Sequence, residues 1–292
     1  CQRYDRRADI RRMVGDARRM DCDFVLVRVE FRVRAGSDNG GGIMILVTGA
    51  AGYIGSYLMK FAGDEVLGID SFIKGRHSNK VLSYDINNVP AIETLLKVHN
   101  ITAIINLAAI VGDPACAMFP HHAKESNYEG VMNLLKAAES APTVTKFVQA
   151  STCSVYGMSD GLLDEDSPTN PLSLYAELKL KAEEEIRESG IQYAILRFST
   201  AFGWSPCPRF DLTVNEFVRD ALNGQEIEVY RKDDWRPYAH VGDLASVCLE
   251  AARKSEIMGI YNVGWDRNNH TKQMIIDTIS KYIHALLRYS VT

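Results

Sequence analysis

The chain has 292 residues, of which 46% are apolar and 24% charged, so it has the composition of a globular protein with a large core. Its 33 basic and 37 acidic side chains give a formal net charge of −4, which argues against nucleic-acid binding by bulk charge. The sequence contains no run of about 18 apolar residues, which argues against a membrane-spanning helix.

Residues 1–43 differ in composition from the rest of the chain. They carry ten arginines, no lysine and seven acidic residues, and they lack the apolar core of a secretory signal. Val27, Val29 and Phe31 alternate with charged residues, which predicts a half-buried strand. Three glycines at 40–42 then indicate a flexible joint. We interpret residues 1–43 as an Arg-rich N-terminal extension and Met44 as the natural start.

From Met44 onward, short apolar runs alternate with amphipathic stretches of helical length. This alternation is typical of an α/β fold with a doubly wound parallel sheet and right-handed crossovers. Residues 44–200 are therefore expected to form a Rossmann-like domain. Strands are expected near 44–48, 65–69, 81–84, 102–107, 146–151 and 192–197, and helices near 53–62, 90–98, 122–139 and 173–188.

The pattern becomes mixed after about residue 200. We expect residues 201–292 to form a smaller α/β lobe that covers a substrate. Its helices are expected near 213–223, 242–254 and 271–287, and its strands near 226–230 and 259–263.

A glycine-rich turn joins the first expected strand to the first expected helix. Glycines there permit a tight turn and let backbone amides approach a pyrophosphate, which the helix N-terminus also favours. The second strand ends in Asp70, about 20 residues later, where a carboxylate can accept hydrogen bonds from ribose hydroxyls and would repel a 2′-phosphate. This arrangement predicts NAD in preference to NADP. The expected cofactor residues of the turn are Gly49, Gly52, Tyr53, Ile54 and Gly55.

A tyrosine and a lysine stand four residues apart near the start of the helix expected at 173–188. Tyr175 and Lys179 thus lie on one helix face, and an ammonium beside a phenol favours the phenolate, lowering the pKa of the tyrosine for proton abstraction. The spacing alone is weak evidence. Support comes from the strand near 146–151, which ends in a hydroxyl cluster at the edge of the sheet where open α/β sheets place their sites.

Cysteine and histidine spacing bears on metal binding and on compartment. The six cysteines are scattered, with no C-x-x-C pair, as is typical of a reduced cytoplasmic protein. His121 and His122 lack a third ligand at a suitable spacing. We therefore expect a cytoplasmic protein without a metal site.

From Met44 to about residue 270 the chain resembles the extended short-chain dehydrogenase/reductases, in particular the NAD-dependent nucleotide-sugar epimerase/dehydratase family. The resemblance rests on ordered motifs, and their combination is far more specific than any one of them. They are the turn at 49–55, Asp70, Asp85-Ile86, Leu107-Ala108-Ala109, Asn127, residues 152–157, the Tyr175/Lys179 pair and residues 236–243.

The resemblance implies roles for individual residues. Tyr175 would be the catalytic acid/base, Lys179 would bind the nicotinamide ribose, and Thr152 would hydrogen-bond the reacting hydroxyl. The remaining cofactor residues would be Asp85 and Ile86 at the adenine, Leu107, Ala108 and Ala109 beside the cofactor, and Asn127 as a brace. Arg209, Asn215 and above all Arg236 would hold the nucleotide diphosphate, for which a guanidinium fork is suited.

We predict an epimerase that acts on a nucleotide-diphosphate sugar through a transient keto-sugar, similar to UDP-glucose 4-epimerase. Dehydratases of the family have an Asp-Glu pair after the catalytic threonine, and Cys153-Ser154 stands there instead, so dehydration is disfavoured. An NAD(P)-dependent keto-sugar reductase or dehydratase of the same family and a non-catalytic NAD sensor remain as alternatives. The resemblance also implies a homodimer formed through the helices near 122–139 and 173–188. Relatives in the family usually continue with further C-terminal elements, so the last lobe is expected to be truncated.

Overall fold

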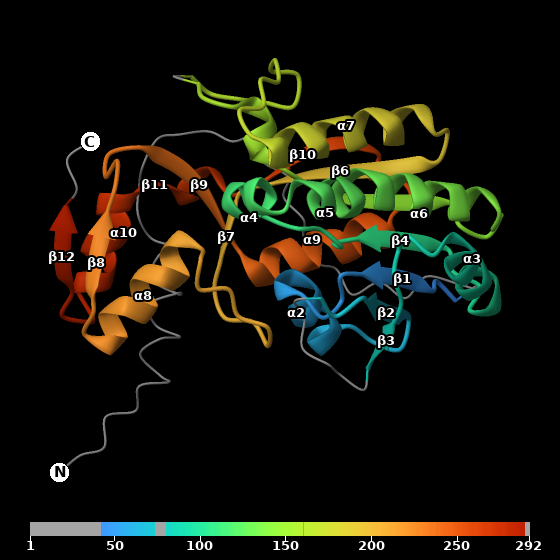
Figure 1. The fold of residues 1–292 in the computed structure, drawn as a ribbon, viewed down its shortest axis with the longest axis horizontal. Coiled ribbons are helices and arrows are strands. Elements are labelled where there is room, and N and C mark those ends of the chain that lie inside the picture. Colours follow the sequence, from blue (N-terminus) through green and yellow to red (C-terminus); the bar gives the residue numbers. More distant parts are fainter. Residues whose placement is uncertain (1–41, 74–79, 160, 290–292) are drawn as a thin grey trace, which may run out of the picture.

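The computed structural model describes residues 42–73, 80–159 and 161–289 (Figure 1). Most of the Arg-rich extension, including its expected strand, lies outside these ranges. No helix of the described part is long and apolar enough to cross a membrane.

A seven-stranded parallel sheet forms the centre of the fold, in the order β10-β6-β5-β4-β1-β2-β3 (Figure 1). Buried apolar runs make its inner strands, as expected for a sheet covered on both faces. The predicted doubly wound α/β fold is therefore confirmed. The strands are β1 (Ile45–Thr48), β2 (Val66–Asp70), β3 (Val81–Ser83), β4 (Ala103–Asn106), β5 (Lys146–Thr152), β6 (Gln192–Phe198) and β10 (Gly259–Val263).

Helices cover both faces of this sheet (Figure 1). On one face α2 (Tyr53–Phe61) and α9 (Val241–Arg253) pack against the strands through Leu58, Leu244 and Cys248. On the other face Leu96, Leu134 and Ala182 belong to the second core cluster, and they come from three helices. These are α3 (Val89–Val98), α6 (Gly130–Glu139) and α7 (Leu174–Glu188).

The helix predicted at 122–139 is composite in the structure. Two short helices, α4 (Asp113–Met118) and α5 (Pro120–Lys124), precede a π-helical turn, η2 (Glu125–Glu129), which continues into α6. The π turn contains Asn127, which is buried. Single π turns within helices occur frequently at functional sites.

The strand predicted at 259–263 forms, but not in the smaller lobe. It is β10, the edge strand of the central sheet next to β6, and α9 covers the same sheet. The chain therefore returns to the large domain between about residues 241 and 263.

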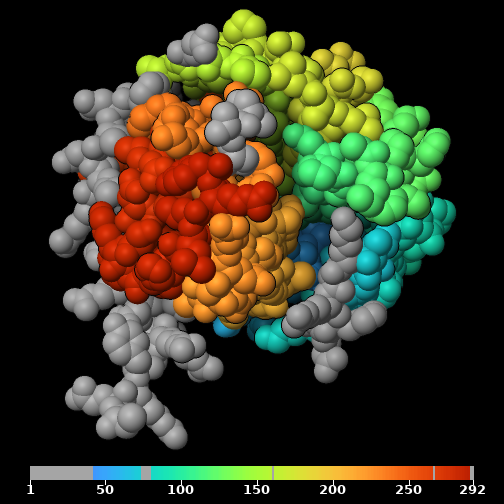
Figure 2. All heavy atoms as spheres, turned by 60° about the vertical axis from the view of Figure 1, so that its left-hand side comes forward, coloured from blue at the N-terminus to red at the C-terminus, as the bar shows by residue number. Residues whose placement is uncertain are grey.

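The remaining C-terminal elements surround a separate apolar cluster that includes Phe217, Ile227 and Ile276. Figure 2 shows them in orange and red, gathered on one side, with blue residues of the first strand-helix unit visible between this lobe and the green helices. The lobe contains α8 (Thr213–Asn223), α10 (Lys272–Ser280), a three-stranded sheet of β7 (Thr200–Phe202), β9 (Trp235–His240) and β11 (Asn269–Thr271), and a pair of β8 (Glu226–Val229) and β12 (Leu286–Tyr289).

The single helix predicted over 271–287 is wrong. Helix α10 ends at Ser280, and Leu286–Tyr289 instead pairs in parallel with β8. Because the helix ends at Ser280, Leu287 can pack against the cluster that contains Ile227 and Val229. Tertiary packing therefore outweighs the helical pattern. The sequence analysis also missed β7, β9 and β11, which are short or carry few apolar residues.

Candidate active site

The glycine turn after β1 is packed too closely for side chains. Gly49 has a φ of +66°, and a Cβ atom there would lie 2.7 Å from backbone atoms of Leu107 and Ala108. A Cβ atom on Gly55 would lie 2.2 Å from the Gly49 carbonyl oxygen. The turn therefore requires glycine at both positions and brings the segment after β4 directly beside it.

The N-terminus of α2 faces this turn without a capping side chain. Gly52 is the N-cap residue, and no acidic residue lies in the first turn of the helix. Among the described residues outside its own helix, a Cβ atom on Gly52 would contact only the Gly49 carbonyl oxygen, at 3.2 Å, so there is space beside Gly52. Such a helix end favours an anion.

Asp70 ends β2 beside the same turn. One carboxylate oxygen accepts a hydrogen bond from the Ala51 amide at 3.0 Å, and the other accepts one from the Phe72 amide at 2.7 Å. The carboxylate is thus held next to the glycine turn, as the cofactor prediction requires.

A ladder of buried polar side chains crosses the end of the sheet. Thr48 donates to the Asn106 amide oxygen at 2.6 Å, and Asn106 donates to Gln149 at 2.9 Å. Gln149 in turn donates to the carbonyl of Ala150 at 2.9 Å. The sequence analysis did not select Asn106 or Gln149, although a polar residue inside an apolar strand was a usable signal.

Lys179 projects from α7 to the same point of the sheet. Its ammonium donates to the Ala150 carbonyl at 2.9 Å and lies 6.0 Å from the centroid of the Tyr175 ring. The structure thus brings the two residues together on one face of α7, as the spacing predicted.

The expected lowering of the pKa of Tyr175 is not seen. Burial raises the pKa of Tyr175 above its usual value, and the nearby Arg209 charge opposes the rise only in part. Burial also lowers the pKa of Lys179, to about 8. Desolvation disfavours the charged form of each group, and Lys179 is not among the groups that shift the pKa of Tyr175.

Thr152 ends β5 and caps the short helix η3 (Cys153–Tyr156). Its hydroxyl accepts a hydrogen bond from the Ser154 amide at 3.1 Å and donates to the Ser154 hydroxyl at 3.1 Å. Thr152 therefore lies at the carboxyl end of β5, as the sequence predicted. It contacts the hydroxyl of Ser154, which was not predicted as a site residue.

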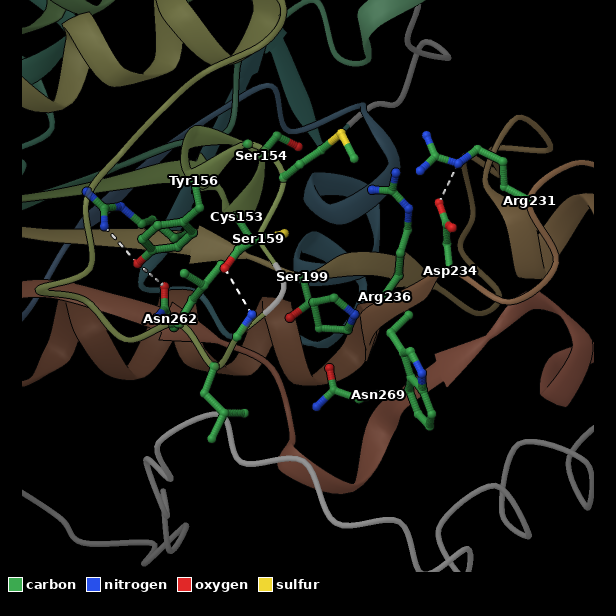
Figure 3. Close-up of a pocket in the computed structure, with 18 of the residues that line it drawn as sticks. Cys153, Ser154, Tyr156, Ser159, Ser199, Arg231, Asp234, Arg236, Asn262 and Asn269 are labelled. Atoms are coloured by element: carbon green, nitrogen blue, oxygen red, sulfur yellow. Dashed lines mark hydrogen bonds and ion pairs between the residues drawn. The ribbon is translucent and has the colours of Figure 1, made fainter. Parts of the chain in front are cut away.

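A cavity of about 520 Å³ opens beyond η3, between the end of the sheet and β9 (Figure 3). Arg236 lines it, and the Arg236 guanidinium has no hydrogen-bond or ion-pair partner among the described residues, whereas Arg231 is paired with Asp234 at 2.7 Å. Burial raises the pKa of the Cys153 thiol to about 11, against the lowering influence of Arg236. Cys153 and Ser154, which directly follow Thr152, line the cavity, whereas Thr152, Tyr175 and Lys179 are not among its lining residues.

Asn127 fixes the loop that follows β4. Its amide oxygen accepts from the Ile110 amide at 2.8 Å, and its amide nitrogen donates to the Ile110 carbonyl at 2.8 Å. Ile110 packs with Leu178 and Tyr175, so the loop that Asn127 holds is in contact with α7.

The predicted adenine contacts differ in exposure. Asp85 is exposed and accepts a hydrogen bond from the Asn87 amide at 2.9 Å. Ile86 is buried and lies against Gly130, where a Cβ atom would come within 2.4 Å of it. Their contact with adenine stays a prediction.

The side chain of Asn215 is fully engaged within the chain. Its oxygen accepts from the Gly203 amide at 2.9 Å, and its nitrogen donates to the Arg209 carbonyl at 2.9 Å and to the Tyr53 hydroxyl at 3.2 Å. Both amide donors of Asn215 are thus used within the chain, and its contact with substrate stays a prediction. Asn215 also holds the loop that carries Arg209, whose guanidinium is paired with Asp211.

Replacing Tyr53 by phenylalanine is expected to lower the free energy of unfolding by about 1–3 kcal/mol. The Tyr53 hydroxyl donates to the Gly203 carbonyl at 2.6 Å, so its loss leaves that carbonyl and the Asn215 amide short of a partner. Urea denaturation followed by circular dichroism measures the change. Tyr57→Phe, one turn further along α2, is the matched control because its hydroxyl has no hydrogen bond among the described residues.

Comparison with known proteins identifies the family. Residues 45–264 match the model of the NAD dependent epimerase/dehydratase family, which is most of the chain. The chain belongs to this family. The resemblance inferred from the sequence motifs is thereby confirmed.

Individual members of the epimerase/dehydratase family show the same likeness. "UDP-glucuronate 4-epimerase 4" of Arabidopsis thaliana is 31% identical over 79% of this chain, which spans only 58% of that protein's length. UDP-glucuronate 4-epimerase of Thermodesulfobacterium geofontis is 29% identical, with 82% of this chain and 80% of that protein covered.

Solved structures of family members match the fold. MoeE5 in complex with UDP-glucose and NAD is 28% identical, with a TM-score of 0.75 and coverage of 85% of each chain. Thermus thermophilus UDP-glucose 4-epimerase in complex with NAD is 25% identical, with a TM-score of 0.75 and coverage of 84% of this chain and 86% of that one.

In the ranges that the structure describes, no three histidine, cysteine, aspartate or glutamate side chains gather as a metal site.

Proposed function

We propose that the protein is an NAD-dependent epimerase that inverts a ring carbon, C4, of a nucleotide-diphosphate sugar through a transient keto-sugar. The observation that carries the proposal is the convergence of three features at one end of the sheet. Tyr175 and Lys179 share a face of α7, the glycine turn lies at the ends of the neighbouring strands, and the cavity beyond η3 holds the unpartnered Arg236. Relatives named for UDP-glucuronate and UDP-glucose support a UDP-sugar as the substrate.

The residues present fit NAD. The open space before Gly52, the uncapped N-terminus of α2 and the carboxylate of Asp70 suit a pyrophosphate and an adenosine ribose without a 2′-phosphate. Leu107 and Ala108, beside Gly49, would line the same groove. Bound there, NAD would supply a reversible hydride acceptor.

Proton transfer is assigned to the chain's own side chains. Tyr175 would accept the proton of the sugar hydroxyl, while Thr152 would hold that hydroxyl by a hydrogen bond. The acceptor is the Tyr175 phenolate, which becomes the phenol when it takes this proton. The ammonium of Lys179, held by the Ala150 carbonyl, would stabilise that phenolate. Because burial raises the pKa of Tyr175, formation of the phenolate depends on the nearby cations, Lys179 and Arg209.

Arg236 is proposed to hold the diphosphate. Arg236→Gln is expected to weaken UDP binding by about 10- to 150-fold, the equivalent of losing a charged hydrogen bond of about 1.5–3 kcal/mol. Isothermal titration with UDP measures the change. The matched control is Arg288→Gln in the same lobe, where the arginine lies on β12 near Glu226 and Glu228. Unchanged UDP affinity in Arg236→Gln would exclude this role.

The proposed activity is tested by incubating the protein and NAD with a panel of UDP-sugars, followed by chromatography and mass spectrometry. An isomer of unchanged mass that Tyr175→Phe does not form would support the epimerase. A product two hydrogens heavier, formed only with reduced cofactor, would indicate the reductase, and loss of water would indicate a dehydratase. Binding of NAD without any product would favour the sensor.

We also propose that the protein is a cytoplasmic homodimer. Within the part of the chain that the structure describes, Cys116, Cys153, Cys207 and Cys248 form no disulfide bond, which is consistent with a reducing compartment. The helical segment 120–139 lies next to α7, where the Tyr128 hydroxyl donates to Glu185 at 2.7 Å, so the two elements together can present one surface to a second copy. Light scattering at several concentrations tests the dimer, and a constant monomer mass would reject it.

A further inference from the structure

A buried ion pair lies one turn of α7 beyond Lys179, next to the proposed catalytic residues. The carboxylate of Glu183 on α7 accepts hydrogen bonds from Arg197 on β6, at 2.7 Å from one terminal nitrogen and 3.1 Å from Nε. Both side chains are almost inaccessible, with 1% and 4% exposed. The mechanism uses neither group, and the sequence analysis selected neither.

The same carboxylate also holds the end of β5. Glu183 accepts a hydrogen bond from the hydroxyl of Ser151, which is buried. Ser151 stands between Ala150, whose carbonyl binds Lys179, and Thr152. Lys179 and Glu183 are one turn apart on α7, so two successive turns of the helix bind two successive residues of the strand.

The ion pair extends toward the cavity through neutral groups. Arg197 donates to the Tyr156 hydroxyl at 2.8 Å, and Tyr156 donates to the Asn262 amide oxygen at 2.7 Å (Figure 3). Tyr156, Arg197 and Asn262 all line the cavity. One buried network therefore joins α7, the ends of β5 and β6, and the cavity wall.

We propose that Glu183 is a positioning residue for the reaction, which keeps α7 in register with the end of β5 so that Lys179 and Thr152 retain their places. The proposal rests on the proposed function for the identity of the reaction. Buried ion pairs contribute little to net stability compared with apolar side chains of the same volume, so stability alone does not account for a charged pair at this point.

The charge of Glu183 also acts on Lys179. Burial lowers the pKa of Lys179, and the thiol of Cys116 on α4 and the carboxylate of Glu183 oppose this lowering. Arg197 faces Glu183, and Arg209, Cys153 and Asp113 act on the neighbouring Tyr175. Activity that needs the Lys179 ammonium is present at low pH and is lost as pH rises through this pKa. Removal of the Glu183 charge should therefore move the loss to lower pH.

Two variants test the proposal without leaving an unpaired buried charge. Ser151→Ala removes only the hydroxyl that Glu183 binds. Glu183→Leu/Arg197→Met removes both charges together and is expected to fold, whereas Glu183→Gln alone would leave Arg197 buried without a carboxylate. Glu184→Gln, an exposed neighbour on α7, is the matched control.

The measurements are kcat and KM against pH on the UDP-sugar that the wild type converts, and the titration of Lys179 by NMR of ¹³C-labelled lysine. We expect kcat to fall by about 10- to 100-fold in Ser151→Ala with KM retained. In the double variant we expect the alkaline limb and the Lys179 titration to move to lower pH, because Glu183 raises the pKa of Lys179 whereas Arg197 is not among the groups that shift it. Folded variants with wild-type kcat and an unmoved Lys179 titration would overturn the proposal. The NMR titration needs no substrate, so it separates this outcome from a failure of the proposed activity.

Discussion

Tyr175→Phe is expected to turn over the UDP-sugar about 10²- to 10⁴-fold more slowly than the wild type, which is the usual contribution of a positioned acid/base. The phenylalanine ring keeps the packing of Tyr175 against Ile110 and Leu178, but it has no oxygen to accept the proton. Affinity for UDP should be unchanged because the proposed diphosphate contact, Arg236, lines the cavity on the β9 side. Initial rates at saturating substrate, together with titration by UDP, separate the two effects.

Tyr128→Phe is the matched control for this variant. Tyr128 packs in the same cluster and its hydroxyl binds Glu185 of α7, yet it lies outside the proposed site. Its rate should equal that of the wild type. If Tyr175→Phe kept wild-type turnover, another group would have to take the proton, and the assignment of Tyr175 would fail.

The central sheet could be predicted because each of its strands is marked by local sequence. Inner parallel strands are buried on both faces, so runs such as Ile45–Thr48 and Ala103–Asn106 are apolar throughout and are separated by helices of clear periodicity. The C-terminal lobe lacks this regularity. The strand Trp235–His240 has two exposed residues at its start, and Leu286–Tyr289 becomes a strand only because β8 is available to pair with it.

The glycine turn, Asp70 and the Tyr175/Lys179 pair could be found from sequence because each depends on short-range spacing. The network of Glu183, Ser151 and Arg197 could not, since its members come from three elements and meet only after the fold forms. The pKa of Tyr175 could not be predicted from local sequence either. Helical spacing predicted the approach of Lys179, but not the burial that raises the pKa of Tyr175.

Gly55→Ala is expected to weaken NAD binding by about 5- to 150-fold, which corresponds to the cost of about 1–3 kcal/mol for forcing an extra methyl group into a packed site. The added Cβ atom would lie 2.2 Å from the Gly49 carbonyl oxygen, 2.7 Å from the Ala50 Cα atom and 2.9 Å from the Gly49 carbonyl carbon. Because all three atoms belong to the backbone, the turn itself must shift, and with it the amides that would face the pyrophosphate. Fluorescence titration with NAD measures the loss.

Gly42→Ala is the matched control, since a Cβ atom at Gly42 has no atom within 4 Å among the described residues. It should bind NAD as the wild type does, and circular dichroism should show both variants folded. Wild-type NAD affinity in a folded Gly55→Ala protein would mean that the pyrophosphate does not lie on this turn. A loss confined to Gly55→Ala would instead place the cofactor at the junction of β1 and α2. The buried ladder runs from Thr48 of β1 across β4 to the Ala150 carbonyl of β5, which also binds Lys179. The cofactor and the lysine beside the proposed acid/base Tyr175 would then lie at the same end of the sheet, which is the arrangement that hydride and proton transfer at one sugar carbon requires.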